Sequence, residues 1–167
     1  MQINQLSKKY NIKKLNPNNA KEVYKLCKNN SIYYEHCPPL ITINGVKEDM
    51  KALPPGKTCE DKFFLGYYDD NVLVAIMDLI TGYPDDNTVY IGLFMTDISM
   101  QGKGIGTAII GELCDYCKTQ GYERIELAWV KGNPQAESFW KKNAFRPIGE
   151  RSSNAAEHVI AAERKLK

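Results

Sequence analysis

The sequence has little net charge and almost no histidine. Of its 167 residues, 22 are Lys or Arg and 20 are Asp or Glu, which leaves a net charge of +2. Such an even balance gives no basic field that attracts nucleic acid, so we expect no nucleic-acid partner. The two histidines, His36 and His158, lie far apart and form no ligand motif, so we expect no metal ion.

The sequence also lacks a long hydrophobic run. No apolar stretch approaches the roughly 18 residues of a membrane span, and the first residues lack the apolar region of a signal peptide. We therefore expect a cytoplasmic protein without a membrane partner. The hydrophobic content of 43% is ordinary for a globular protein, and the length suits one domain over residues 1–167.

Cysteine is present in an odd number, five, which argues for reduced thiols. Cys114 and Cys117 have the spacing of half a zinc or redox site, but no second cysteine pair or histidine cluster accompanies them. They lie in a segment that we predict to be helical. We therefore expect both to be small apolar residues that face the core.

A glycine-rich segment lies between a predicted strand and a predicted helix. Residues 89–95 are rich in β-branched and aromatic residues, which is typical of a buried strand. Residues 105–117 carry apolar side chains at helical spacing, and Gly121 suits the end of that helix. The segment between them reads Gln101-Gly102-Lys103-Gly104-Ile105-Gly106.

This segment has the features of a phosphate site. The first N–H groups of a helix have no partner inside the helix, and they carry the positive end of its dipole. The three glycines, Gly102, Gly104 and Gly106, remove side chains that would keep a ligand away from those groups. Lys103 would add a positive charge. The sequence therefore predicts a site for a phosphate or pyrophosphate.

Two common phosphate motifs fit poorly. The nucleotide P-loop pattern is absent, and the dinucleotide fingerprint lacks its third glycine after Gly104 and Gly106. Glu126 lies 20 residues after Gly106, where an acid could bind a ribose, so the dinucleotide alternative stays open. A glycine-rich turn that serves only packing is a further alternative.

The remaining patterns predict one mixed sheet with helices on both faces. Expected strands cover residues 9–15, 62–68, 72–80, 88–96, 123–130, 145–149 and 158–164. Expected helices cover 16–30, 46–53, 105–121 and 133–144, and residues 152–156 form a turn. The order is β-α-α-β-β-β-α-β-α-β-β, an α/β fold that combines an antiparallel meander with a βαβ unit.

The glycine-rich segment fits the pattern Q/R-x-x-G-x-G/A, and it resembles the coenzyme A pyrophosphate loop of the GCN5-related N-acetyltransferase (GNAT) family. The element order resembles that family over residues 8–166. A further motif, N-x-x-A-x-x-F-Y-x-K-x-G-F, is matched at Asn133, Ala136, Phe139, Lys142 and Phe145. The chain departs from it at Trp140, where Tyr is usual, and at Ala144, where Gly is usual.

The resemblance implies an N-acetyltransferase that uses acetyl-CoA as acetyl donor. The glycine segment would hold the pyrophosphate, and the end of the preceding strand would pair with the pantetheine arm. A backbone N–H there would face the acetyl carbonyl. The residues expected to bind the cofactor are Phe94, Met95, Thr96, Gln101, Gly102, Lys103, Gly104, Ile105, Gly106, Thr107, Asn133 and Trp140.

Acetyl transfer needs a neutral amine. An alkyl ammonium with a pKa of about 10.4 is neutral in only about one molecule in a thousand at pH 7, which costs roughly 4–5 kcal/mol. The strand at 88–96 carries no carboxylate, so the candidate general bases are Asp78, Glu35 and Glu126. Asp78 stands in an otherwise apolar strand. The alternative interpretation is that Asp78 is an exposed acid at the end of the strand.

The departing thiolate needs a proton or a hydrogen bond. The indole of Trp140 cannot give up a proton near neutral pH, and Trp140 has the alternative role of a core anchor. The candidates for this step are Tyr83, Tyr33 and Tyr34, or a thiolate stabilised by hydrogen bonds alone. A second hypothesis for the chain is a non-catalytic module that binds acyl-CoA.

Residues 31–59 are rich in proline, aromatic and polar side chains, which is typical of a binding loop, or of a connector that packs its tyrosines on the sheet. Tyr33, Tyr34, Glu35 and Asp78 would suit a cationic amine. We therefore expect a small-molecule or peptide amine as partner. A homodimer is compatible with the sequence.

Overall fold

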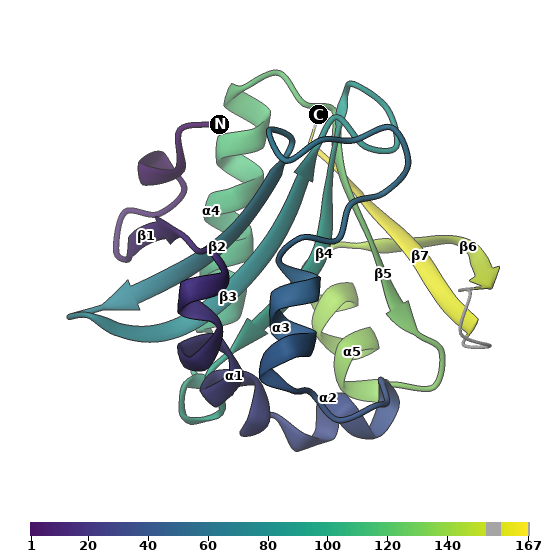
Figure 1. Ribbon diagram of the computed structural model, residues 1–167. Coiled ribbons are helices and arrows are strands. Elements are labelled where there is room, and N and C mark those ends of the chain that lie inside the picture. Colours follow the sequence, from purple (N-terminus) through teal and green to yellow (C-terminus); the bar gives the residue numbers. More distant parts are fainter. Residues whose placement is uncertain (153–157, 167) are drawn as a thin grey trace.

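The computed structural model describes residues 1–152 and 158–166, which form one seven-stranded sheet in the order β1-β2-β3-β4-β5-β7-β6 (Figure 1). The strands are β1 (Asn11–Lys14), β2 (Lys62–Asp69), β3 (Val72–Thr81), β4 (Thr88–Thr96), β5 (Arg124–Val130), β6 (Arg146–Ser152) and β7 (His158–Lys165). The helices are α1 (Ala20–Lys28), α2 (Ser31–His36), α3 (Ile43–Asp49), α4 (Ile105–Thr119) and α5 (Pro134–Lys142).

The sheet is mixed, as the sequence predicts. Strands β1 to β4 form an antiparallel meander, and β4 pairs with β5 in parallel. Helix α4 makes the crossover between these two parallel strands, because a tight turn cannot join parallel neighbours. Strand β7 then pairs antiparallel with both β5 and β6. The glycine-rich segment lies in this crossover, between the end of β4 and the start of α4.

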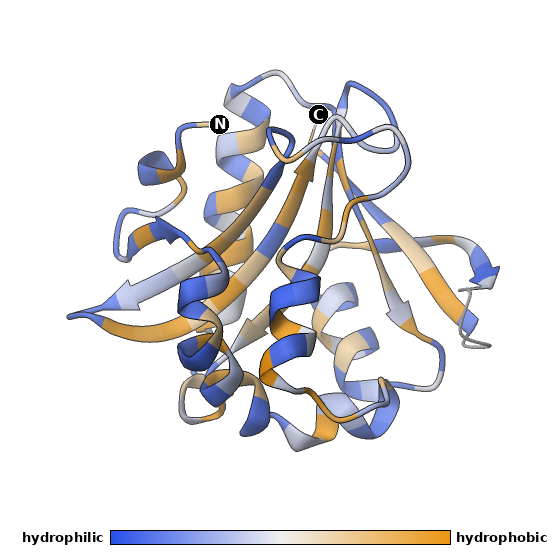
Figure 2. Cartoon of the chain, in the orientation of Figure 1, coloured by the Kyte–Doolittle hydropathy of each residue, from blue (hydrophilic) through white to orange (hydrophobic). Residues whose placement is uncertain are grey.

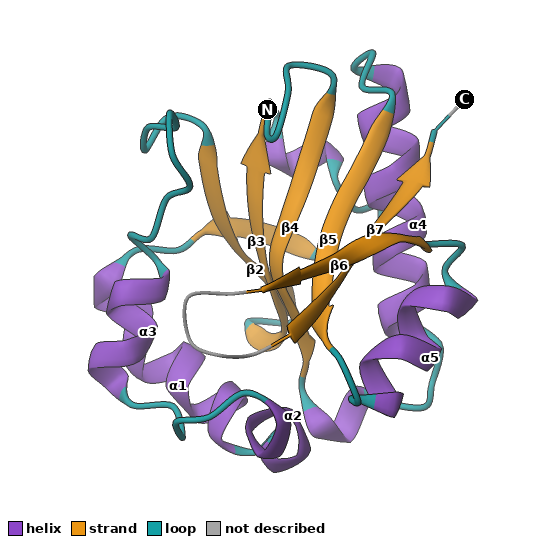
Figure 3. Cartoon of the chain, turned by 90° about the vertical axis from the view of Figure 1, so that its right-hand side faces the viewer, coloured by secondary structure: helices purple, strands orange, loops and turns teal. Residues whose placement is uncertain are grey.

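Helices cover both faces of the sheet (Figure 3). Helices α4 and α5 supply Ile109, Leu113 and Trp140 to the larger cluster of buried apolar residues. Helices α1, α2 and α3 supply side chains to a second cluster, with Tyr34 from α2 among them. Strand β3 is hydrophobic along most of its length (Figure 2), because both of its faces are covered.

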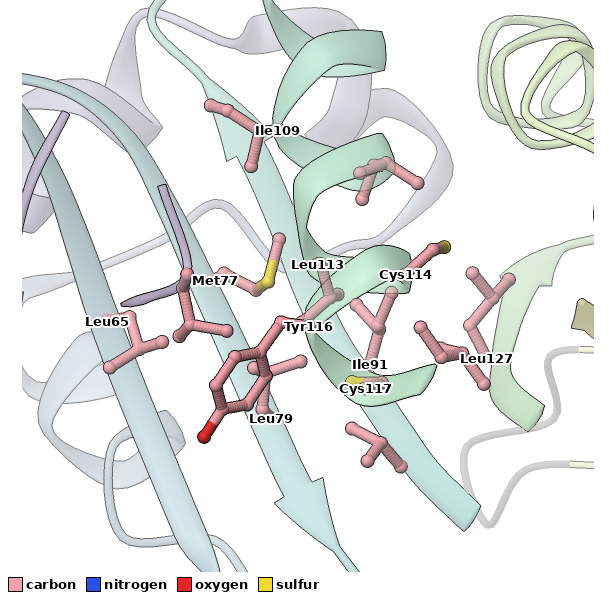
Figure 4. Close-up of a cluster of buried hydrophobic side chains, with 14 of the residues drawn as sticks. Leu65, Met77, Leu79, Ile91, Ile109, Leu113, Cys114, Tyr116, Cys117 and Leu127 are labelled. Carbon is pink, nitrogen blue, oxygen red and sulfur yellow. The ribbon is translucent and has the colours of Figure 1, made fainter. Parts of the chain in front are cut away.

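The larger cluster lies between α4 and the sheet (Figure 4). Cys114 and Cys117 are buried in it with reduced thiols, which confirms that they face the core. Burial raises the pKa of Cys114 to about 11 and that of Cys117 to about 12. Both thiols therefore stay protonated at neutral pH.

One helix differs from the prediction. Residues 31–36 form α2, whereas the sequence indicated a loop there. Tyr34 is buried and packs edge-to-face on Tyr33, with ring centroids 4.9 Å apart. Tertiary packing of these rings outweighs the weak helix propensity of aromatic residues. The predicted turn at residues 152–156 lies outside the described residues, except that Ser152 ends β6.

Two kinds of feature are absent from the described part of the chain. None of its helices is long and apolar enough to span a membrane. Nor do three His, Cys, Asp or Glu side chains come together there in a way that could hold a metal ion.

Candidate active site

The sheet opens between β4 and β5. The parallel pairing runs from Thr88 with Arg124 to Ile91 with Leu127. The register between β3 and β4 shifts at the same level, because Leu79 pairs with Ile91 while Asp78 pairs with Leu93. Gly92 is the extra residue of this β-bulge, which bends β4 away from its neighbour. The two strands therefore diverge toward their carboxyl ends.

The glycine-rich segment connects the open end of β4 to α4. Gly102 and Gly104 have φ angles of 73° and 78°, which lie in the left-handed region that favours glycine. At Gly106 an added Cβ would stand 3.1 Å from the ring of Phe139, so glycine allows α4 to start against α5. The first turn of α4 then presents its free N–H groups at the opening between the strands.

A first cavity of about 350 Å³ lies in front of this turn. All the residues that the sequence predicted for cofactor binding line it, except Lys103, whose side chain is exposed. The wall is thus built from the end of β4, the glycine-rich segment, the first turn of α4, and α5. The backbone donors and the positive helix end suit an anionic ligand.

Gln101 has a structural partner. Its Nε2 donates to Oδ1 of Asn30 at 2.6 Å, and Nδ2 of Asn30 donates to the carbonyl oxygens of Leu26 at 3.1 Å and Thr96 at 3.2 Å. Asn30 is buried at the end of α1. This network joins α1, the end of β4 and the glycine-rich segment.

Asn133 opens α5 as the sequence predicts. Its side-chain oxygen accepts a hydrogen bond from the backbone N–H of Ala136 at 3.0 Å, and Pro134 occupies the first helical position. This cap satisfies one of the free donors at the helix start. Asn133 is buried and lines the first cavity, so its amide NH₂ is the group left for a ligand.

Trp140 belongs to an aromatic cluster. Its ring centroid lies 4.9 Å from that of Phe139, 5.1 Å from that of Phe145 and 6.1 Å from that of Phe94. The side chain is 8% exposed. These contacts explain why a large apolar ring is accommodated where the resemblance implies a tyrosine.

A second cavity of about 120 Å³ lies between the diverging strands. It shares Tyr33, Phe94, Asn133, Ala136 and Trp140 with the first cavity, so the two are contiguous. Its other walls come from the backbone and side chains of β4 and β5, from Val159 of β7 and from Cys37. The two cavities meet where β4 separates from β5.

Tyr33 stands at this meeting point, and among the described residues it is the tyrosine that lines both cavities. Burial raises the pKa of the Tyr33 phenol above its ordinary value, and the neighbouring Cys37 raises it further. The phenol therefore stays protonated at neutral pH, and its hydrogen-bond partner here is the side chain of Cys37. Tyr33 is one of the residues predicted from the sequence to give the departing thiolate a proton or a hydrogen bond.

Of the predicted general bases, Asp78 is the one that lies against the wall of the second cavity, at Gly92. An added Cβ at Gly92 would stand 2.8 Å from its Oδ2, so the carboxylate lies directly behind Gly92. Nζ of Lys62 donates to Oδ2 at 2.7 Å, while Oδ1 is buried without a hydrogen-bond partner. Burial raises the pKa of Asp78, although Lys62 opposes the change. The carboxylate is a buried ion-pair partner, not an exposed acid at a strand end.

The other candidate acids and phenols lie away from both cavities. Glu35 is exposed on α2, and Tyr83 packs against Tyr90 with ring centroids 5.5 Å apart. Glu126 is buried and accepts a hydrogen bond from Nε of Arg124 at 2.9 Å. The carboxylate that the dinucleotide alternative needs is therefore absent from the described walls of the cavities.

Sequence reasoning missed several lining residues. Asn30 carries no motif and reaches the cavity only because α1 ends beside Thr96. The sequence motif includes Ala136, Phe139 and Lys142, but it did not predict that they line the first cavity. The other residues missed in the wall of the first cavity are Met100 and Gln135.

Solved structures share this fold over nearly the whole chain. An acetyltransferase from Thermus thermophilus matches with a TM-score of 0.74 at 17% identity, over 93% of this chain and 96% of that one. The PaiA N-acetyltransferase from Thermoplasma acidophilum, in complex with coenzyme A, matches with a TM-score of 0.66 at 18% identity, over 93% and 98%. The ribosomal-protein-S18-alanine N-acetyltransferase from Escherichia coli matches with a TM-score of 0.68 at 12% identity, over 95% and 94%.

Sequence comparison identifies relatives of the chain and the family to which it belongs. The chain is 32% identical over 108 residues to YobR of Bacillus subtilis (strain 168), an uncharacterized N-acetyltransferase. The match covers 64% of this chain but 40% of that relative's length. The model of the acetyltransferase (GNAT) family matches residues 30–145. Because that match covers more than half of the sequence, the chain belongs to the GNAT family of acetyltransferases.

Proposed function

We propose that this protein transfers the acetyl group of acetyl-CoA directly to a primary amine. The observation that carries the proposal is the first cavity, whose walls combine the end of β4, the glycine-rich segment and α5. Backbone donors at the start of α4 suit the pyrophosphate, and the edge of β4 that β5 leaves open from Phe94 to Thr96 suits the amide groups of the pantetheine arm.

The thioester would then lie where the two cavities meet. The amine nitrogen attacks the carbonyl carbon, the carbon–sulfur bond breaks, and an acetylated amine and the thiol of coenzyme A form. In the net reaction one proton passes from nitrogen to sulfur. A backbone N–H beyond the bulge at Gly92 would face the oxyanion of the tetrahedral intermediate.

Two side chains serve the proton steps in this proposal. Asp78, behind Gly92, takes the proton of the amine through a water molecule, and its raised pKa makes it a stronger base. Tyr33 donates a hydrogen bond to the departing sulfur, in place of the phenol that Trp140 does not provide. For Glu35 and Tyr83, which lie away from the cavities, a catalytic role stays a prediction.

Ligand-dependent thermal stability tests the cofactor site without knowledge of the amine. A ligand at 100 times its Kd should stabilise the fold by about 2.7 kcal/mol. We expect stabilisation by acetyl-CoA and by free coenzyme A, and none by NAD or ATP. The absence of a shift with both coenzyme A species at millimolar concentration would contradict the proposal.

A further inference from the structure

The described wall of the second cavity carries no charged side chain. None of its described lining residues is Asp, Glu, Lys, Arg or His. The carboxylate behind Gly92 belongs to Asp78, which is already paired with Nζ of Lys62 at 2.7 Å. The wall is instead mostly aliphatic and aromatic, with Leu93, Val130 and Val159 among its residues, and it includes the amide of Asn133.

A second positive charge on the acceptor would therefore be costly in this cavity. A buried ammonium loses its hydration and needs a carboxylate or several oxygen acceptors in return. The aromatic and acidic pocket expected from Tyr33, Tyr34, Glu35 and Asp78 is not assembled, because Tyr33 alone of the four lines the cavity. The reacting nitrogen does not bear this cost of burying a charge, because it must be neutral to attack.

We propose that the acceptor is a primary amine on a compact apolar carrier with no second positive charge. This inference rests on the proposed acetyl transfer. The cavity of about 120 Å³ limits the size of the carrier. An unbranched chain of four carbons is a compact apolar carrier of this class. Polyamines and other polycations fall outside this class.

Butylamine and 1,4-diaminobutane form a matched pair for the test. They have the same carbon chain, and they differ in whether the far end carries an ammonium. With acetyl-CoA as donor, we expect kcat/KM for butylamine to exceed that for 1,4-diaminobutane by about tenfold or more, which corresponds to about 1.4 kcal/mol. The second ammonium lowers the pKa of the reacting nitrogen and the diamine has two reactive ends, so kcat/KM is compared per neutral amine nitrogen.

A variant of the cavity wall makes the test specific. Val159 on β7 is half-buried and lies opposite Val130 of β5. Val159→Asp introduces the missing carboxylate, and we expect it to shift the preference toward 1,4-diaminobutane by about tenfold. Val159→Asn has the same shape without the charge and should keep the preference for butylamine. Thermal unfolding of both variants checks that they fold.

Three results would overturn the proposal. One is equal or better turnover of 1,4-diaminobutane by the unmodified protein. Another is turnover of neither amine by protein that binds acetyl-CoA, which rejects the acceptor class and leaves the cofactor site intact. The third is tighter binding of hexanoyl-CoA than of acetyl-CoA without any amine, which would assign the cavity to the acyl chain. Failure to bind any acyl-CoA would instead contradict the proposed function.

Discussion

Tyr33 is the residue on which the proposed chemistry can be tested most locally. Tyr33→Phe removes the phenol oxygen and keeps the ring that packs on Tyr34. A hydrogen bond to a charged group contributes about 1.5–3 kcal/mol, so we expect kcat to fall by roughly 10- to 100-fold. The Kd of acetyl-CoA should stay unchanged, because the bond forms to sulfur only as it departs.

Tyr90→Phe is the matched control for this change, since Tyr90 packs on Tyr83 outside both cavities. Steady-state kinetics and acetyl-CoA titration of both variants give the comparison. Equal kcat values for Tyr33→Phe and the unmodified protein would remove Tyr33 from the mechanism.

The ion pair of Lys62 and Asp78 makes a second prediction. The side chains are 5% and 13% exposed, so Lys62→Met leaves a buried carboxylate without its partner. We expect the free energy of unfolding to fall by about 3–5 kcal/mol at pH 7. The double variant Lys62→Met with Asp78→Leu should recover most of the loss, because an apolar pair replaces both charges.

This loss depends on pH in a known direction. The pKa of Asp78 is raised in the folded protein, so folding favours the protonated acid. The loss of stability from the ionised Asp78 is therefore complete above the pKa of Asp78 in the folded protein. It disappears as the pH falls toward the pKa of Asp78 in the unfolded chain, about 3.9. Urea unfolding at pH 7 and pH 5 should show a smaller loss at pH 5. A loss that grows on acidification would contradict the buried, unpaired carboxylate.

Helix α4 and the segment before it are the elements that build the first cavity. Gly104 has a φ of 78°, and an L-residue there costs about 1–2 kcal/mol. We expect Gly104→Ala to lower the free energy of unfolding by that amount and to weaken acetyl-CoA binding. Chemical denaturation and calorimetric titration measure the two effects.

Gly111 provides the control within the same helix. It has ordinary helical geometry, and an added Cβ would meet no atom within 4 Å. Gly111→Ala should raise the stability by about 1 kcal/mol and leave binding unchanged. If Gly104→Ala behaved like Gly111→Ala, the strained turn would have no part in the site.

Elements with strong local signals could be predicted from the sequence. The strand–glycine–helix segment and the capped start of α5 at Asn133 are set by neighbouring residues, and both lie where the pattern indicated. Helix α2 was missed because burial of Tyr34 against a distant part of the chain stabilises it. The second cavity was also beyond prediction, because it depends on the divergence of β4 and β5 after Gly92.

At the scale of the whole molecule, we propose that the chain is one domain. The single sheet carries both apolar clusters, one on each face, so neither cluster can be lost alone. We expect one cooperative unfolding transition. Trp129 of β5 and Trp140 of α5 report on tertiary packing, and far-ultraviolet circular dichroism reports on all helices. Urea midpoints that differ between the two probes would indicate two independently folding units.

The central claim is acetyl transfer, and the most direct test is the product. The protein would be incubated with deuterated acetyl-CoA and butylamine, and mass spectrometry would follow the amine. Our account predicts N-acetylbutylamine that carries the deuterated acetyl group, with an equivalent amount of free coenzyme A. Saturable acetyl-CoA binding without acetylated product from any of a broad panel of amines would contradict it and indicate a binding module.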